Sequence, residues 1–370
     1  MKVLFTAYDF YPNTGGIATY AWEMANQLQQ QGHQVLMLTK DRGLHRKEPF
    51  PVQYFSSLSS GVLSLLPMAK AIRSAVHSFQ PEVIVNSLWL PGGLATRLAI
   101  GTQIPYHLIV HGMEVKNSVH SFKGLLRLGL NPIRRSVFDK AAGIHCVSEF
   151  TRALVFSETG VQRADVIHNG VNPERFLCLQ PNSANYPQLV SVCRLVPHKG
   201  IDKVLLALPQ VIEKFPELQY LIIGEGPDLN RLQQLTEQVH LQNHVQFLGK
   251  IDHQRLVQLY GQSHLNILMS RIEGQHVEGF GLVILEAACC KTPSLGGASG
   301  GITDAIVEGE TGWLANPADE KLIAEKLIAI LSDPKELVVR GQKAFTRATT
   351  EMTWEKAAEK LTSYLERPLA

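Results

Sequence analysis

The chain has 370 residues, of which 45% are hydrophobic and 18% are charged, and its formal net charge is +2. This length suits two domains of ordinary size, and the composition excludes a disordered or collagen-like chain. The balanced charge gives no general basis for nucleic-acid binding, so no nucleic-acid partner is expected. No apolar run is long enough to cross a bilayer and no signal-peptide pattern opens the chain, so we expect a cytoplasmic protein.

Apolar runs of strand length alternate with longer helical patterns along the chain, which predicts parallel sheets covered by helices. In the first half, helices are predicted at Ile17–Gln31 and Leu63–Phe79. The strands predicted in this half are Val3–Ala7, Gln34–Thr39, Glu82–Asn86, Tyr106–Val110, Gly143–Val147 and Asp165–His168.

The segment Asn172–Pro187 loses this periodicity and is rich in proline, which predicts a linker. The pattern then begins again, and a final helix is predicted at Thr353–Glu366. The strands of this second series are Leu189–Cys193, Gln219–Ile223, Val245–Leu248, Leu265–Leu268 and Pro293–Leu295. Two series predict two doubly wound α/β domains, in which ligands bind beyond the carboxyl ends of the strands.

The cysteines are odd in number and include no CxxC pair: Cys146, Cys178, Cys193, Cys289 and Cys290. They lie in predicted strands, helices or their flanks. We therefore expect buried, reduced thiols instead of disulfides or zinc ligands.

Two glutamates enclose a glycine-containing turn in Glu278-Gly-Phe-Gly-Leu-Val-Ile-Leu-Glu286, where a loop leads into a helix. Gly279 and Gly281 allow backbone to approach a ligand closely, and N–H groups at the helix start can receive phosphate. Glu286 can accept from two ribose hydroxyls, and Glu278 from the hydroxyls of a transferred sugar. The alternative is a solvated charge before an amphipathic helix.

Two cations follow the first strand of the second series in Arg194-Leu-Val-Pro-His-Lys199-Gly200. Arg194 and Lys199 therefore fall at the carboxyl edge of that sheet, where their charges suit a pyrophosphate. They would also stabilise a departing nucleoside diphosphate in place of a divalent metal. The alternative is an exposed basic loop, and the position between a strand and a helix favours the functional interpretation.

Together these motifs resemble the large retaining, family 4-like glycosyltransferase family of GT-B fold, which includes phosphatidylinositol mannosyltransferases and sucrose synthases. The loop Arg271–Glu278 is most similar to the bacterial phosphatidylinositol mannosyltransferase branch. The similarity covers nearly the whole chain through Gly15-Gly16-Ile17, His111-Gly112, Asn169-Gly170-Val171, Ile223-Gly224-Glu225-Gly226, Phe247-Leu248-Gly249, and Gly300-Gly301 with Gly309 and Gly312.

The resemblance implies an α/β fold of GT-B architecture, with two Rossmann-like doubly wound domains facing an inter-domain cleft. Residues 1–180 would form the acceptor domain, on which the C-terminal helix 353–370 would pack. Residues 188–350 would form the domain that binds the nucleotide-sugar donor.

The resemblance also implies a role for each matching residue. The catalytic set would be Arg194, Lys199, Glu278 and His111. Acceptor positions would be Gly15 and Ser148, and donor-binding positions would be Gly16, Gly224, Gly226, Lys250, Ile251, Phe280, Gly281, Leu282 and Glu286. Asp304 is left out of the catalytic set, because the family usually has glutamate there.

Structural alternatives stay open for three of these predictions. The pair Gly15–Gly16 can be only a turn before a helix. His111 can be a core histidine whose hydrogen bonds are satisfied. Ser148 is expected first to cap the helix that follows it, with acceptor contact second.

The expected activity is transfer of a hexose, with retention, from a UDP- or GDP-linked donor to a lipid-linked, saccharide or small-molecule acceptor. Such an enzyme would serve polysaccharide or glycolipid biosynthesis. No HxH, HExxH, CxxC or DxD cluster lies at a predicted cleft position, so no metal and no other cofactor is expected. A sugar-nucleotide epimerase of the same fold and a non-catalytic nucleotide-sugar-binding protein are the alternatives. A dehydrogenase is disfavoured, because no strand leads into GxGxxG followed by an acidic residue.

A basic, apolar segment at 122–138 contains Lys123, Arg127, Arg134 and Arg135. Such a surface would allow peripheral contact with anionic lipid at the inner face of the membrane. The commoner outcome is a helix that packs on the first domain with its cations in water.

Overall fold

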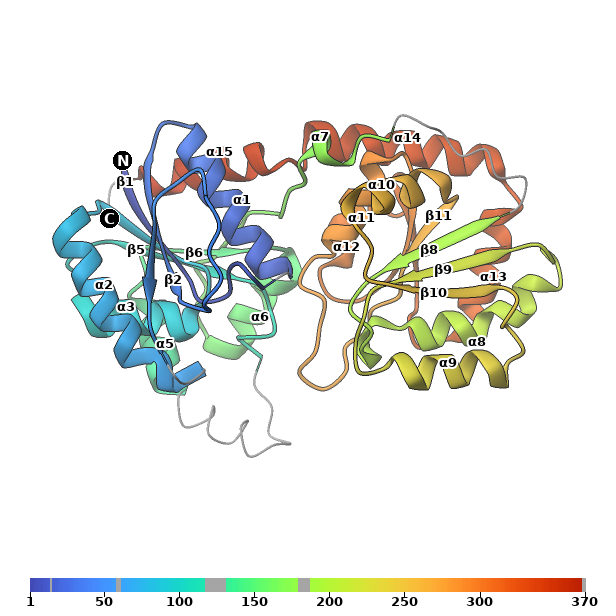
Figure 1. Cartoon of the computed structure of the whole chain (residues 1–370), viewed down its shortest axis with the longest axis horizontal. Coiled ribbons are helices and arrows are strands. Elements are labelled where there is room, and N and C mark those ends of the chain that lie inside the picture. The colour runs from blue at the N-terminus through green and yellow to red at the C-terminus, as the bar shows by residue number, and fades with distance from the viewer. Residues whose placement is uncertain (14, 58–60, 117–130, 179–186, 368–370) are drawn as a thin grey trace. The chain divides into compact units, whose positions relative to one another are not determined.

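The computed structural model describes residues 1–13, 15–57, 61–116, 131–178 and 187–367. The chain forms two compact units (Figure 1). The first comprises Met1–Asn169 with Trp354–Ala370, and the second comprises Gly170–Thr353. Each unit is built on its own parallel sheet, as the two series of alternating patterns predict.

The first unit contains a seven-stranded parallel sheet of order β3-β2-β1-β4-β5-β6-β7. Its central strands are buried along their whole length, as is usual when helices cover both faces of a sheet. All six predicted strands are present, and β3 is an additional edge strand of four residues. The strands are β1 (Lys2–Ala7), β2 (Gln34–Lys40), β3 (Val52–Phe55), β4 (Val83–Asn86), β5 (Tyr106–Val110), β6 (Gly143–Cys146) and β7 (Asp165–Val166).

The last helix of the chain, α15 (Trp354–Leu365), packs on the first helix, α1 (Gly16–Gln30). The ring of Tyr20 on α1 lies edge-on to the ring of Trp354, with 5.7 Å between centroids. The Thr362 hydroxyl donates to Gln31 Oε1 at 2.8 Å. The other helices in the described part of this unit are η1 (Gly61–Ser64), α2 (Leu65–Phe79), η2 (Trp89–Gly93), α3 (Leu94–Ile100), α5 (Asn131–Asp139) and α6 (Glu149–Thr159).

The second unit contains a six-stranded parallel sheet of order β10-β9-β8-β11-β12-β13. All five predicted strands are present, and β13 is an additional edge strand of four residues. The strands are β8 (Gln188–Val192), β9 (Gln219–Ile223), β10 (Val245–Gly249), β11 (Leu265–Leu268), β12 (Ser294–Gly297) and β13 (Gly312–Ala315).

Helices on the second sheet bury apolar side chains at helical spacing, such as Val204, Leu205, Leu208 and Val211 on α8. The predicted linker 172–187 begins with a short helix, α7 (Pro173–Phe176), and residues 179–186 lie outside the described part. The remaining helices are η3 (Pro197–Lys199), α8 (Ile201–Ile212), α9 (Leu229–Gln238), α10 (His253–Gln262), α11 (Leu282–Cys289), α12 (Ile302–Ala305), α13 (Glu320–Leu331) and α14 (Pro334–Thr350).

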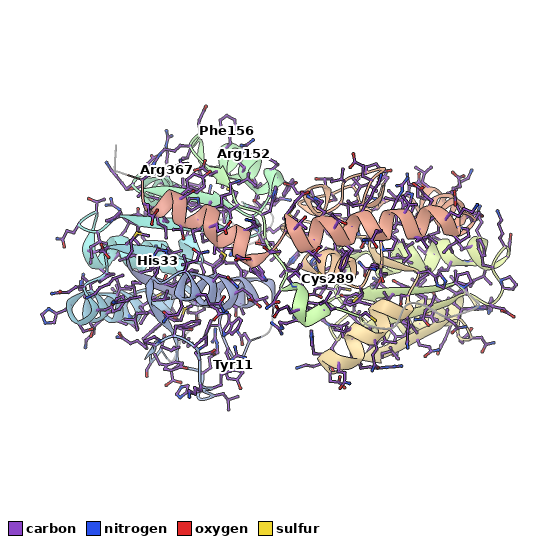
Figure 2. All side chains as sticks on the ribbon, turned by 90° about the horizontal axis from the view of Figure 1, so that it is seen from above. Tyr11, His33, Arg152, Phe156, Cys289 and Arg367 are labelled. Atoms are coloured by element: carbon purple, nitrogen blue, oxygen red, sulfur yellow. The ribbon has the colours of Figure 1, made fainter. Side chains whose placement is uncertain are left out.

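All five cysteines lie in the described residues, and all are reduced, as predicted. Cys146, Cys289 and Cys290 are buried, whereas Cys178 and Cys193 are partly exposed. Cys289 lies on α11 (Figure 2), where burial raises the pKa of its thiol to about 12. A thiol with this pKa stays protonated at neutral pH and is a poor nucleophile.

Candidate active site

The predicted residues of the second unit collect along one edge of its sheet. Arg194 and Lys199 follow β8, Lys250 follows β10, and Glu278 lies in the loop between β11 and α11. Because the strands are parallel, the loops that follow them leave the sheet at the same edge. The sequence prediction that these loops share one edge is therefore confirmed.

The loop that carries Arg194 and Lys199 is held by main-chain hydrogen bonds to the loop that follows β9. The Cys193 N–H donates to the Ile223 carbonyl at 3.0 Å, and the Leu195 N–H donates to the Glu225 carbonyl at 2.9 Å. The loop then makes the single turn η3 and enters α8. The backbone that presents both cations is thus fixed by the neighbouring strand.

The glycines Gly224 and Gly226 are needed for this close approach. A Cβ at Gly224 would lie 1.9 Å from the Cys193 carbonyl oxygen, and one at Gly226 would lie 2.1 Å from the Leu195 carbonyl oxygen. Real Cβ atoms do not approach backbone this closely, so any side chain here would displace the loop of Arg194. In this structure the two glycines serve contact between the two loops, a role that the resemblance had not implied.

Lys199 and Glu278 form a direct ion pair, and their side chains are only 19% and 16% exposed. Burial lowers the pKa of Lys199, but the charge of Glu278 and its hydrogen bond outweigh burial and raise it above its ordinary value. Lys199 therefore carries a positive charge at any physiological pH. The sequence motifs placed these residues in one site, and the structure brings their charged atoms into contact.

The backbone of Glu278 is fixed from the side of β12. The Gly301 N–H donates to the Glu278 carbonyl at 2.9 Å, and a Cβ at Gly300 would lie 2.3 Å from that oxygen. The Ser270 hydroxyl lies 3.5 Å from Glu278 Oε2. Ser270 lies two residues after the end of β11, so an inspection of the first few residues after each strand could have added it to the site.

The start of α11 presents N–H groups next to this glutamate. Gly281 is the N-cap with φ 97°, a left-handed conformation that favours glycine, and no side chain caps the helix. Phe280 is buried, while Leu282 is half-buried. A helix N-terminus with uncapped N–H groups is suited to a phosphate.

Glu286 lies one turn further along α11 and accepts a hydrogen bond from the Tyr260 hydroxyl at 3.1 Å. Burial raises the pKa of Glu286 from 4.5 to about 7, against the hydrogen bond from Tyr260 and the charge of Arg175, which lower it. Tyr260 is completely buried in α10 and was absent from the sequence predictions. Its place in an apolar periodic pattern marks it only as a core residue.

The other predicted donor positions of this unit are more open. Arg194 and Lys250 are exposed, and Ile251 is half-buried. Within the described ranges, Arg194 makes no ion pair with any carboxylate. Arg194 shares the sheet edge with Lys199, and in the described part of the chain it forms no ion pair with Glu278 or Glu286.

In the first unit, Gly15 is the exposed N-cap of α1 and Gly16 is its first residue. Ser148 is completely buried and caps α6, where its hydroxyl accepts from the Thr151 N–H at 3.1 Å. The capping prediction for Ser148 is confirmed. Its hydroxyl is used inside the fold, so the structure gives no support to the secondary prediction of an acceptor contact.

His111 follows β5, and its ring lies edge-on to Tyr20 with 5.0 Å between centroids. Burial lowers the pKa of His111 to about 4, although a hydrogen bond with the backbone of Ser87 raises it, so the ring is neutral at pH 7. Its Nε2 is buried and has no hydrogen-bond partner among the described residues. The alternative of a fully satisfied core histidine is therefore wrong for this nitrogen.

The basic segment 122–138 is described only from Asn131 onward, so Lys123 and Arg127 lie outside the described residues. Arg134 is 3% exposed and donates to the Val115 carbonyl at 2.5 Å. The expectation that its charge lies at a surface is wrong, because the guanidinium binds backbone carbonyls inside the fold. Arg135 is exposed and lies 3.6 Å from Asp139. In the described parts of the chain, no helix combines the length and apolar character needed to span a bilayer.

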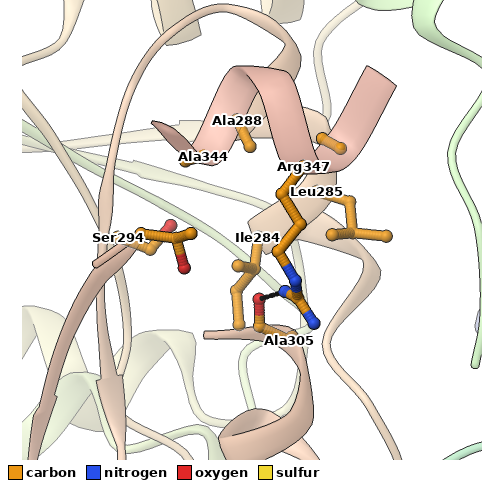
Figure 3. A pocket seen from close by; sticks show the side chains of 9 residues that line it. Ile284, Leu285, Ala288, Ser294, Ala305, Ala344 and Arg347 are labelled. Atoms are coloured by element: carbon orange, nitrogen blue, oxygen red, sulfur yellow. Dashed lines mark hydrogen bonds between the residues drawn. The ribbon is translucent and has the colours of Figure 1, made fainter. Parts of the chain in front are cut away.

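A small cavity of about 10 Å³ lies between α11 and α14 (Figure 3), and none of the predicted site residues lines it. Arg347 closes it and donates to the Ala305 carbonyl at 2.7 Å. This volume is about that of one water molecule, so the cavity is a packing defect and not a ligand site. Among the described residues, no three His, Cys, Asp or Glu side chains are grouped as metal ligands would be.

Comparisons with known proteins agree with this arrangement. Residues 14–175 match the Glycosyltransferase Family 4 model, and residues 180–347 match the model of the Glycosyl transferases group 1. The GDP-mannose-dependent monoacylated alpha-(1-6)-phosphatidylinositol monomannoside mannosyltransferase of Corynebacterium glutamicum is 24% identical, over 99% of this chain and 98% of that protein. The N-acetyl-alpha-D-glucosaminyl L-malate synthase of Bacillus anthracis is 25% identical, over 90% and 89%.

Solved structures share the fold across the whole chain. Sucrose-phosphate synthase from Thermosynechococcus elongatus has a TM-score of 0.83 and 22% identity, over 98% of this chain and 97% of that one. HepE of Anabaena, solved in complex with UDP and glucose, has a TM-score of 0.80 and 21% identity, over 99% of both chains. With a family 4 domain followed by a group 1 domain, the chain belongs to the glycosyltransferases of GT-B fold.

Proposed function

We propose that the protein is a retaining, metal-independent glycosyltransferase that moves a hexose from a UDP- or GDP-linked donor to an acceptor. The observation that carries the proposal is the buried contact between Lys199 and Glu278 beside the uncapped start of α11. This arrangement combines a fixed cation and free N–H groups for phosphates with a carboxylate for hydroxyls. A nucleotide sugar is a ligand that needs all three.

Catalysis in this proposal rests on the leaving group. As the bond from the sugar to the diphosphate breaks, negative charge develops on the diphosphate, and Lys199 and Arg194 stabilise it. Lys199 is suited to this role because its charge is permanent and its position is fixed. Arg194 is exposed and without a carboxylate partner in the described part of the chain, so its guanidinium is available for phosphate oxygens.

The two glutamates recognise hydroxyls. Glu278 accepts from the donor sugar, and ionised Glu286 accepts from the ribose. No carboxylate is assigned as a nucleophile, so we propose that the acceptor attacks from the face that the diphosphate leaves. A phosphate oxygen then takes the acceptor proton, which gives retention without a covalent enzyme intermediate. The roles of His111, Gly15 and Gly16 toward sugar and acceptor stay predictions.

The acceptor is proposed only as a class. One relative is named for a lipid-linked acceptor and another for L-malate, so a lipid-linked, saccharide or small-molecule acceptor fits the relatives equally. Peripheral contact with a membrane belongs to the first of these options. It would have to use cations other than Arg134, whose charge is buried.

The first experiment is a thermal-shift panel with UDP, GDP, ADP and their sugars. The stabilising donor is then incubated with acceptor extract in excess EDTA, the product is found by mass spectrometry, and NMR of its anomeric signal reports the stereochemistry. We expect one nucleotide to stabilise the protein and a retained linkage to form without metal. Stabilisation by no nucleotide would overturn the proposal, and an isomerised sugar from donor alone would favour the epimerase.

A further inference from the structure

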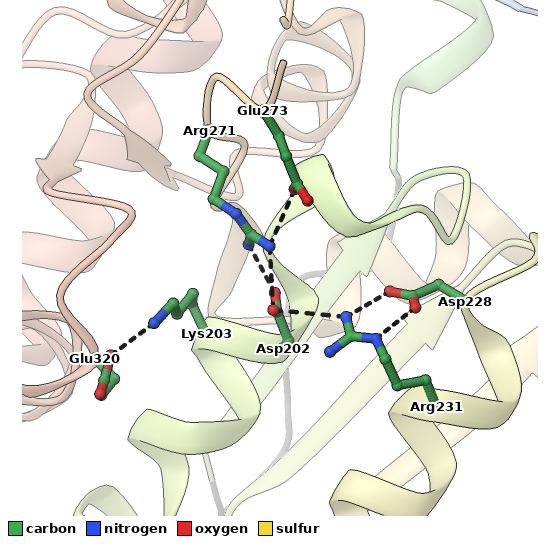
Figure 4. A network of polar contacts seen from close by, with 7 residues as sticks. All are labelled: Asp202, Lys203, Asp228, Arg231, Arg271, Glu273 and Glu320. Carbon is green, nitrogen blue, oxygen red and sulfur yellow. Dashed lines mark hydrogen bonds and ion pairs between the residues drawn. The ribbon is translucent and has the colours of Figure 1, made fainter. Parts of the chain in front are cut away.

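The loop that carries Glu278 forms a second ion pair near the start of α8, in addition to the one between Glu278 and Lys199. Arg271, at the beginning of this loop, binds the Asp202 carboxylate with both terminal nitrogens, at 2.8 and 3.2 Å (Figure 4). Asp202 stands in the first turn of α8, three residues after Lys199. One short segment therefore holds both ends of the Arg271–Glu278 loop, through Asp202 at one end and Lys199 at the other.

Between these ends the loop is a compact hairpin. Glu273 and His276 exchange both main-chain hydrogen bonds at 3.0 Å, around a turn in which Gly274 has φ 59°. The ring of His276 stacks on the ring of His198 with 5.0 Å between centroids, and the Arg271 N–H donates to the His198 carbonyl at 2.9 Å. The hairpin is thus compact, and its contacts with the segment before α8 hold its orientation.

Asp202 is itself built into the fold. Its side chain is 12% exposed, and a second guanidinium, that of Arg231, lies 3.5 Å from it. Arg231 is held in turn by both carboxylate oxygens of Asp228, at 2.6 and 2.7 Å. Asp202 therefore joins the starts of α8 and α9 to the loop of Glu278. Within the hairpin, Arg271 also forms an ion pair with Glu273 at 3.2 Å (Figure 4).

A bound ligand affects the two ion pairs, Lys199–Glu278 and Asp202–Arg271, in different ways. In the proposed function, on which this inference rests, the diphosphate binds the ammonium group of Lys199, and the hydroxyls of the sugar bind the carboxylate of Glu278. A bound donor therefore competes with the contact between Lys199 and Glu278. The contact between Asp202 and Arg271 involves neither Lys199 nor Glu278. It can therefore persist when the donor replaces the contact between those two residues.

We propose that Asp202 and Arg271 are positioning residues, whose ion pair keeps the Glu278 carboxylate at the sugar site while Lys199 binds the diphosphate. Neither residue touches the donor. Their loss should leave the diphosphate site intact, because the loop of Arg194 and Lys199 is also held by main-chain hydrogen bonds to β9 and the loop that follows it. It should weaken only the additional affinity that the sugar gives to the nucleotide sugar over the nucleoside diphosphate.

The experiment measures binding of the nucleoside diphosphate and of its sugar, by calorimetry, for Asp202→Asn, Arg271→Met, Arg271→Lys and the double variant Asp202→Asn/Arg271→Met in the full chain. The ligand pair is the one that wild type binds among UDP with UDP-glucose and GDP with GDP-mannose. The matched control is Lys203→Met, which removes the neighbouring ion pair of α8 with Glu320 at 3.0 Å. Glu320 is half exposed and lies outside the site, so the control should stay within about twofold of wild type.

We expect Asp202→Asn and Arg271→Met each to weaken the nucleotide sugar and to lower kcat by about 10- to 100-fold, with the diphosphate Kd changed less than about twofold. The double variant should be no worse than either single variant, and Arg271→Lys should recover part of the loss. Equal weakening of diphosphate and sugar would show a general structural role and overturn the inference, as would unchanged sugar binding. If Asp202→Asn fails to fold, the binding and kcat of Arg271→Met alone test the inference. Wild type that binds neither pair would instead refute the proposed function itself.

Discussion

Replacing Glu286 by glutamine should stabilise the ligand-free protein while it weakens the site. Burial raises the pKa of Glu286 from 4.5 to about 7, so ionising it in the folded state costs about 3 kcal/mol more than in the unfolded chain. Glutamine is neutral at every pH, and its carbonyl can still accept from the Tyr260 hydroxyl. The cost of the buried charge therefore disappears in Glu286→Gln.

The sign of the pH dependence follows from the raised pKa. Between pH 4.5 and about 7 the folded protein binds more protons at Glu286 than the unfolded chain, so this residue lowers the stability of wild type as the pH rises. The two proteins should be equally stable near pH 4.5. Above pH 7, Glu286→Gln should be the more stable by up to about 3 kcal/mol, or about 6–12 °C in the melting temperature of the second unit.

Differential scanning calorimetry of the ligand-free protein at pH 5 and pH 8 measures this difference. Glu325→Gln, at an exposed position of α13, is the control and should not alter the pH dependence. Glu286→Gln should also bind nucleotide about tenfold more weakly, because the charged acceptor for the ribose is lost. A Glu286→Gln protein that is less stable than wild type at pH 8, or equally shifted at both pH values, would refute the reasoning.

Three further predictions concern the same edge of the sheet. Lys199→Ala should lower turnover by about 100- to 1,000-fold while circular dichroism stays unchanged, and wild-type turnover would remove Lys199 from the phosphate site. Gly226→Ala should cost about 1–3 kcal/mol of unfolding free energy and lower kcat, because its Cβ meets the Leu195 carbonyl; an unaltered melting temperature would contradict this contact. Nucleotide affinity should rise between pH 6 and pH 8 as Glu286 ionises, and Glu286→Gln should abolish that rise, which titration calorimetry can measure.

The sequence predicted the architecture well, because buried parallel strands such as Tyr106–Val110 are runs of mostly apolar residues. The edge strands β3 and β13 were missed, since four residues with little alternation carry no strand signal. Within the site, motifs placed Lys199 and Glu278 at one edge, but their contact depends on the hairpin between β11 and α11. Tyr260 and Asp202 were missed for the same reason, because each acts through a partner far away in the sequence.

The return of α15 to α1 makes the first unit discontinuous along the chain, while the second unit is one uninterrupted stretch. During synthesis on the ribosome, the face of α1 around Tyr20 stays uncovered until Trp354 emerges, and Trp354 emerges only after the entire second unit. Fragments for separate study should therefore be cut asymmetrically. Residues 170–353 form a self-contained piece, whereas an N-terminal fragment needs α15 fused after residue 169 to cover that face.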